Sequence, residues 1–169
     1  MSIANVWLLQ PINREDKLYN RKGETLMAAE GIPIQVSMTT EVQQGGEQKD
    51  IHVSGKGELV EKERGTYVTF TEQLQDIGEV KTVIKIQRPS ELTIIRSGAV
   101  SMRQAYVEGE EKSGSYGTPY GTFETLAKTK HVHVDRPNES LLNVTLDYDL
   151  ELQGQFAGSY QVAIDVKES

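Results

Sequence analysis

Four polar side chains have the types and spacing of a small-molecule binding site: Arg96, Gln104, Tyr116 and Tyr120. Arg96 occupies an even-numbered, otherwise apolar position of one predicted strand, and Gln104 does the same in the next strand. Both side chains are therefore predicted to point inward. The planar guanidinium of Arg96 can bind a carboxylate or phosphate. Two interpretations stay open: a polar lining of a ligand cavity, or an arginine that only covers the core and hydrogen-bonds chain ends.

A second set of residues has the spacing of metal ligands on a strand: His131, His133 and Asp135. Alternate residues of a strand share one face, and imidazole and carboxylate groups are ligands for zinc and similar metals. The set lacks a fourth ligand and lies beside the turn at Arg136 and Pro137. We interpret it as a solvated face and assign no metal to it.

Groups suited to catalysis are scarce in this sequence. Cysteine is absent, which excludes a thiolate nucleophile, a disulfide and a cysteine-ligated metal. Asp147, Asp149 and Glu151 alternate with apolar residues, so we expect an outward acidic stripe instead of a general acid and base pair. The phosphate-binding glycine loop, the nucleophile elbow and the zinc-peptidase helix motif are also missing. The sequence predicts neither catalytic residues nor a cofactor.

The charge and the N-terminal sequence restrict the partners and the location. A formal net charge of -7 disfavours nucleic acid and anionic membranes, which attract positive charge. The apolar run Val6–Leu9 is stopped by Pro11, and it is too short for the apolar core of a signal peptide. The lack of cysteine fits a reducing compartment. We therefore expect a cytoplasmic protein, and its oligomeric state stays open.

The candidate site residues must be positioned by β-strands, and the pattern of these strands is clearest in the central part of the sequence. Residues 80–87 alternate between apolar and polar side chains, and residues 92–96 and 100–106 resume the pattern after breaks at Pro89 and Gly98. Three consecutive strands joined by tight turns predict an antiparallel meander. Such a meander needs further strands before its apolar face is dry.

The rest of the chain supplies those strands. The period-two alternation also covers residues 32–42, 51–60, 67–70, 123–134, 142–152 and 156–166. We predict a single all-β domain over residues 27–169, with eight to ten antiparallel strands of about ten residues each. Long regular strands leave exposed edges unless the sheet closes, so we expect a closed barrel. A β-sandwich shows the same alternation and is the alternative.

The inward phase of residues 123–134 is ambiguous. With even positions inside, Lys128 and Lys130 are buried, and each unpaired lysine costs about 4 to 7 kcal/mol. Such costs rival the stability of a whole domain. We therefore favour odd positions inside through Thr129, followed by a bulge that turns Val132 and Val134 inward. The histidines of this strand are then predicted to lie on the surface.

Residues 1–26 differ from the rest, because residues 13–26 are mostly polar and charged. We interpret residues 1–26 as a poorly packed leader or an N-terminal extension that adds to an edge. An alternative is that they are not native and that translation starts at Met27, because codons for Lys22, Gly23 and Glu24 can form a purine-rich ribosome-binding run.

One family resembles this sequence. The run Arg96–Gln104 (RSGAVSMRQ), the preceding strand Gly78–Lys85 and the segment Tyr116–Gly121 (YGTPYG) carry the likeness. Over about residue 31 to the C-terminus the chain resembles the YwiB-type family of uncharacterised bacterial proteins. The resemblance implies a calycin-like or lipocalin-like closed barrel and a source among low-GC Gram-positive bacteria. It implies no activity and no catalytic residues.

These observations lead to one predicted function and one alternative. The first is a non-enzymatic protein that binds a small, partly apolar or anionic ligand inside its barrel, through an open end. The alternative is a protein-interaction or assembly module with a solid core, which uses its outer surface or an edge near Pro119.

Overall fold

The structure, a computed structural model, describes residues 18–19, 25–26 and 31–169. Every regular element in these ranges is a β-strand, and no helix of the described residues is long and apolar enough to cross a membrane. The short strands β1 (Leu18–Tyr19) and β2 (Thr25–Leu26) pair with each other. Most of the predicted leader, residues 1–26, lies outside the described residues.

Ten longer strands form a closed antiparallel barrel, as predicted, and the alternative β-sandwich is wrong. Each strand pairs with its neighbours in the sequence, and β12 pairs with β3 to close the barrel. Closure leaves none of these ten strands as a free edge. The strands are β3 (Ile32–Gln44), β4 (Glu47–Lys62), β5 (Gly65–Leu74), β6 (Gly78–Arg88), β7 (Glu91–Gly98), β8 (Ser101–Val107), β9 (Glu111–Thr118), β10 (Gly121–Asp135), β11 (Leu142–Leu152) and β12 (Gln155–Glu168).

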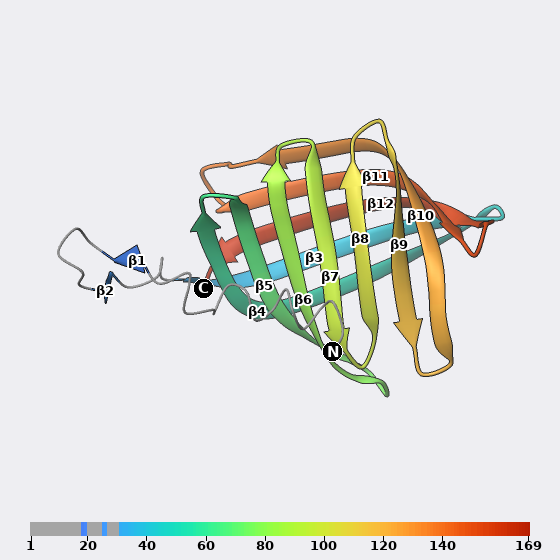
Figure 1. Cartoon of the computed structure of the whole chain (residues 1–169), viewed down its shortest axis with the longest axis horizontal. Coiled ribbons are helices and arrows are strands. Elements are labelled where there is room, and N and C mark those ends of the chain that lie inside the picture. Colours follow the sequence, from blue (N-terminus) through green and yellow to red (C-terminus); the bar gives the residue numbers. More distant parts are fainter. Residues whose placement is uncertain (1–17, 20–24, 27–30) are drawn as a thin grey trace.

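The barrel has two walls whose strands cross each other (Figure 1). The strands β5 to β9 form one wall, and β11, β12 and β3 form the other. The two longest described strands, β4 and β10, contribute to both walls, because each pairs with one wall near its start and with the other near its end. Crossed walls need such corner strands, which bend at bulges or glycines.

The sequence of β4 and β10 shows how each strand turns its corner. β4 carries Gly55 and Gly57 where its pairing with β5 begins, and a Cβ at Gly57 would overlap the carbonyl oxygen of Thr69. In β10 the register shifts between Thr129 and His131, which is the bulge that the sequence predicted. These glycines and this bulge let the sheet bend without losing its pairing.

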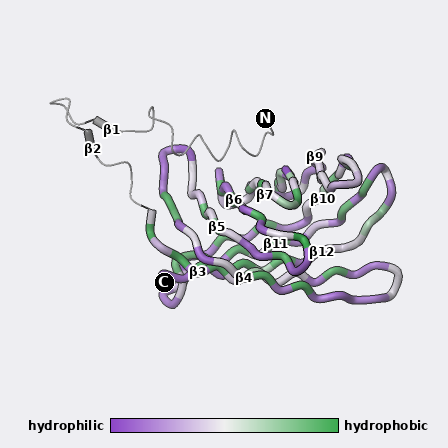
Figure 2. Tube along the Cα trace, turned by 90° about the horizontal axis from the view of Figure 1, so that it is seen from below, coloured by the Kyte–Doolittle hydropathy of each residue, from purple (hydrophilic) through white to green (hydrophobic). Residues whose placement is uncertain are grey.

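Successive side chains of each strand point alternately to the interior and to the outer face. Figure 2 shows the matching alternation of hydropathy along the chain. Thr125, Ala127 and Thr129 are buried before the bulge and Val132 after it, so the predicted phase of β10 is confirmed. The predicted meander is also confirmed, because β6, β7 and β8 pair in that order. The core is formed mainly by aliphatic residues of all strands but β9, with Phe70, Tyr106 and Tyr148 among them.

Candidate binding site at one end of the barrel

The two ends of the barrel are packed differently. Five hairpin turns lie at one end, which we call the open end: residues 45–46, 75–77, 99–100, 119–120 and 153–154. Inward-facing apolar residues near these turns are only half-buried, among them Met38, Val53, Met102, Leu150 and Tyr160. Inward-facing residues toward the opposite end are almost completely buried, among them Ile34, Leu59, Ile86, Leu92, Leu142 and Val166. Partly buried apolar side chains are therefore more numerous at the open end of the described barrel, although Ile32, Val134 and Leu141 toward the opposite end are partly buried as well.

The long hairpins explain this difference. β4 pairs with β3 over residues 47–59 but with β5 only over residues 56–62, so the β3–β4 hairpin extends beyond the opposite wall. The hairpin of β11 and β12 projects on the same side in Figure 1. The inner faces of both hairpins have no facing wall among the described residues at their tips, which is why their side chains stay partly exposed.

The large hydrophobic residues that are exposed among the described residues lie on strands or turns toward the open end. Ile51, Ile77, Tyr120 and Phe156, which we call the rim, all lie in or near its five turns. Tyr120 is 95% exposed in the turn between β9 and β10. Tyr120 was predicted to belong to the polar lining; this prediction is wrong because Pro119 and Tyr120 form the turn and leave the strand alternation.

Arg96 points inward, as predicted, but its charge is already paired. Its Nη2 donates to Oε2 of Glu72 at 2.8 Å, and the Thr82 hydroxyl donates to the other carboxylate oxygen at 2.9 Å. The Glu72 side chain is 2% exposed and that of Arg96 is 19% exposed. Arg96 Nε is buried and has no hydrogen-bond partner. The site therefore offers a neutral ion pair and one spare N–H donor, not a free cation.

Gln104 is an internal cross-link between strands. Its amide donates to the carbonyl oxygens of Ala105 and Lys112, at 3.0 and 2.9 Å, and its Oε1 accepts from the Thr125 hydroxyl at 2.6 Å. These contacts join β8 to β9 and β10. Tyr116 lies half-buried on the inner side of β9, paired with Met102 and Phe123. Of the four residues predicted to line the site, Arg96 and Tyr116 are left facing the open end.

Three tyrosines that were not among the predicted site residues cross the interior beside Arg96. The rings of Tyr106 and Tyr148 lie 4.6 Å apart, and Tyr148 stacks on Tyr160 at 5.1 Å with an interplanar angle of 10°. Burial raises the pKa of Tyr106 to about 12 and holds that of Tyr148 well above its usual value. These phenols stay neutral and fill the barrel between β8 and β12. Their even positions within alternating strands were the available signal, and the same holds for Glu72.

The predicted weak metal ligands lie on the outer face. His131, His133 and Asp135 are exposed, as the phase of β10 required, and His131 Nδ1 lies 3.7 Å from Glu108. Within the described residues no three histidine or acidic side chains are placed to hold a metal ion. Asp147, Asp149 and Glu151 lie on the outer face as well.

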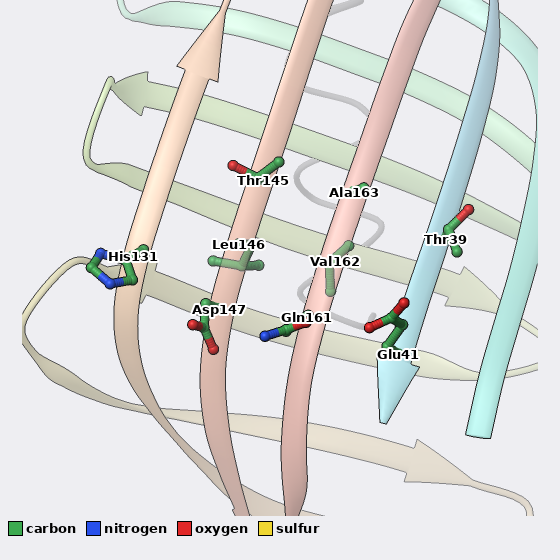
Figure 3. Close-up of a pocket in the computed structure, with 9 residues that line it drawn as sticks. All are labelled: Thr39, Glu41, His131, Thr145, Leu146, Asp147, Gln161, Val162 and Ala163. Carbon is green, nitrogen blue, oxygen red and sulfur yellow. The ribbon is translucent and has the colours of Figure 1, made fainter. Parts of the chain in front are cut away.

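A shallow hollow of about 310 Å³ lies on the same outer face (Figure 3). Its lining comes from β3, β10, β11 and β12: Thr39, Glu41, His131, Thr145, Leu146, Asp147, Gln161, Val162 and Ala163. The labelled polar side chains of Glu41, Asp147 and Gln161 spread along its floor and do not converge on one point (Figure 3). The hollow follows from the curvature of this wall and contains none of the predicted lining residues.

Comparisons with known proteins agree with this architecture. The chain is 28% identical over 120 residues to an uncharacterised β-barrel protein, YwiB of Bacillus subtilis strain 168, covering 71% of this chain and 82% of that protein. The crystal structure of the Bacillus subtilis ywiB protein superposes with a TM-score of 0.72 at 26% identity, covering 82% of this chain and 93% of that one. Residues 36–164 match the model of a domain of unknown function, DUF1934. The chain therefore belongs to the DUF1934 family.

Proposed function

We propose that this protein binds a small, partly apolar molecule at the open end of its barrel. The half-buried ring of inward-facing residues supports this proposal, because these side chains pack against the core and still leave part of their apolar surface accessible. A ligand that removes about 200 Å² of such surface from water gains about 5 kcal/mol before the costs of association. That gain suffices for a weak to moderate complex.

The polar groups narrow the chemistry of the ligand. Glu72 neutralises Arg96, so a strongly anionic ligand would have to compete with a carboxylate that is already in place. A neutral ligand avoids this competition, and it can accept a hydrogen bond from the buried, unpaired Nε of Arg96 only if that side chain shifts to expose the atom. We therefore favour a mostly apolar molecule with one carbonyl, ether or hydroxyl oxygen over a phosphate or carboxylate.

We assign no catalysis to this site and expect the protein to act in the cytoplasm. Both oxygens of the Glu72 carboxylate accept hydrogen bonds, so this group is not free to act as a general base. The cytoplasmic location remains a proposal that rests on the cysteine-free sequence.

Native mass spectrometry of the protein purified from its own host tests the proposal. We expect a small molecule to be retained, and we expect Met102→Lys at the open end to lower its occupancy because a charge enters the apolar ring. Ala163→Lys, an exposed change on the outer face of β12, is the control and should leave the complex intact. Equal occupancy in both variants, or no retained molecule and no binding of apolar fluorescent probes, would remove the proposal.

The rim supports a second candidate function, a protein-interaction module. Ile77, Tyr120 and Phe156 are more than half exposed and lie at the same end of the barrel. Exposed aromatic and aliphatic side chains are enriched in protein interfaces. Cross-linking in the host, with Ile77→Ser plus Tyr120→Ser as the variant, separates the two functions. Loss of cross-links with an unchanged retained molecule would show that the rim serves a protein partner.

A further inference from the structure

One side of strand β4 has no neighbouring strand over the first nine of its sixteen residues. Closure gives β4 a partner on each side, but its pairing with β3 starts at Glu47, whereas its pairing with β5 starts only at Lys56. The β3–β4 hairpin projects past β5 to β9 in Figure 1. Residues 47–52 are all exposed, so this stretch is accessible to a partner. We call residues 47–55 the free edge.

The backbone of the free edge offers a donor and an acceptor at every second residue. Residues 45–46 form a two-residue turn, so Gln44 and Glu47 are joined by both of their backbone hydrogen bonds. The odd-numbered residues of β4 therefore bond to β3, and the N–H and C=O groups of its even-numbered residues point the other way. From Lys56 onward these even-numbered residues bond to β5. Within the described chain, four of them have no strand to bond: Gln48, Asp50, His52 and Ser54.

An edge of this kind is a template for a further strand. Natural sheets blunt exposed edges with proline, a bulge, short length or charged side chains. The free edge has no proline, its pairing with β3 runs without a shift in register, and it is longer than an average strand of about five or six residues. We propose that an extended peptide segment of a partner protein adds to the free edge as a further antiparallel strand. This interaction uses backbone groups and does not depend on either function proposed above.

The inner face of the free edge sets one half of the partner's chemistry. Val53 is partly buried against the core, and Ile51, two residues nearer the turn on the same face, is 40% exposed. Lys49 follows on this face and is exposed. Side chains directly opposite each other in an antiparallel pair lie on the same face and touch. The partner segment should therefore place apolar residues opposite Val53 and Ile51 and an acidic residue opposite Lys49.

The outer face of the free edge sets the other half. Asp50 accepts a hydrogen bond from the Gln48 amide at 3.1 Å, and His52 lies on the same face. Neither Lys49 nor Asp50 forms an ion pair within the described part of the chain. The partner should therefore place a basic residue opposite Asp50 and small polar residues opposite the other two. Read from its N-terminus, an antiparallel partner has the basic residue directly before the acidic one, which fixes its direction.

Binding of a synthetic peptide to the full-length protein tests the proposal. The probe is a fluorescent peptide of sequence Thr-Thr-Val-Thr-Ile-Lys-Glu-Thr-Lys, which meets these requirements when it lies opposite residues 55 to 47, and anisotropy measures its affinity. In an antiparallel pair the peptide's outer-face residues bond to β4, and the N–H groups of its inner-face residues point away.

Two N-methylated forms of the peptide distinguish strand addition from simple apolar contact. Methyl groups on the backbone nitrogens opposite Gln48, Asp50 and His52 should weaken binding about tenfold or more, because they remove hydrogen bonds to the free edge. Methyl groups on the nitrogens opposite Lys49, Ile51 and Val53 should change the affinity less than about threefold. Equal affinities of the two forms, the reverse order, or no saturable binding of the unmethylated peptide would overturn the proposal.

A matched pair of variants tests the same edge from the side of the protein. His52→Pro removes an N–H group that makes no bond to β3, and proline is tolerated where the N–H side of an edge strand faces solvent. His52→Ala also removes the imidazole and its 3.2 Å contact with the Thr39 hydroxyl, but it keeps the N–H group. We expect His52→Pro to bind the peptide about tenfold more weakly than His52→Ala, which should bind like the wild type.

The outcomes of this comparison decide between occupants of the free edge. Equal affinities of His52→Pro and His52→Ala, both shown to be folded by circular dichroism, would overturn the proposal. Sedimentation velocity without the peptide examines a second copy of the chain as the occupant. Self-association of the wild type that His52→Pro abolishes and His52→Ala retains would assign the free edge to a second copy, and this result would also overturn the proposal.

Discussion

Arg96 on β7 reaches across β6 to Glu72 on β5, and the two side chains pair inside the barrel at 2.8 Å. Thr82 on the intervening strand donates to the same carboxylate. One carboxylate therefore ties three adjacent strands together near the open end. The partners are unequal, because Glu72 is almost fully buried whereas Arg96 keeps some contact with water.

The difference in burial between Glu72 and Arg96 predicts how much stability is lost when the ion pair is broken. Arg96→Ala leaves the Glu72 carboxylate buried without its cation, which should lower the free energy of unfolding by about 3 to 5 kcal/mol. The control is Arg88→Ala, which removes an ion pair with Glu91 from a side chain that is 75% exposed and should cost at most about 1 kcal/mol. Urea unfolding measures both values. A cost for Arg96→Ala no larger than the control would show that the pair does not stabilise the barrel.

The bulge in β10 predicts a difference between two deletions. Deletion of Lys130 removes the extra residue but leaves Val132 and Val134 in the inward phase after Thr129. Deletion of Lys128 instead moves Lys130 into the interior, where an unpaired lysine is costly. The Lys128 deletion should therefore be less stable than the Lys130 deletion by about 3 kcal/mol or more. Urea unfolding of the two proteins measures this, and equal stabilities would mean that the strand re-forms its bulge elsewhere.

The sequence was sufficient for the barrel because apolar alternation and the cost of buried charge act locally. The phase of β10 followed from the cost of burying Lys128 and Lys130 within a single strand. The same reasoning could not predict the ion pair between Arg96 and Glu72. These residues are 24 positions apart in the sequence and meet only through the register of β5, β6 and β7. Without a known partner, an inward Glu72 looks too costly to propose. The outer hollow depends on the curvature of a wall, which alternation does not encode.

Glycine at the corner of β4 is required by a close approach of two strands. A Cβ at Gly57 would overlap the Thr69 carbonyl oxygen and crowd Phe70 Cα at 2.7 Å, both of them backbone atoms of β5. Gly57→Ala should therefore separate β4 from β5 and lower the free energy of unfolding by about 3 kcal/mol or more. Gly154→Ala is the control, because its Cβ would meet no atom within 4 Å and only its positive φ adds strain, about 1 kcal/mol. Thermal unfolding ranks the two, and the reverse order would contradict the close approach.

Alkaline pH should destabilise the barrel through its buried phenols. Burial raises the pKa of Tyr106 to about 12, whereas a tyrosine in the unfolded chain titrates near 10. Between about pH 10 and pH 12 the unfolded chain therefore binds fewer protons than the folded chain. The linkage relation then makes the free energy of unfolding fall by up to about 1.4 kcal/mol per pH unit for each such group. This contribution is complete below pH 10 and is lost as the pH rises through the folded value.

Tyr106→Phe isolates this contribution from other groups that titrate at high pH. We expect the variant to lose less stability than the wild type between pH 9 and pH 11, because one buried proton no longer has to be retained. Tyr120→Phe, at a side chain that is 95% exposed, is the control and should keep the wild-type slope. Urea unfolding at a series of pH values measures the three slopes. Equal slopes for Tyr106→Phe and Tyr120→Phe would mean that Tyr106 titrates like a solvent-exposed phenol, and the interior of the barrel beside Arg96 would then be wet.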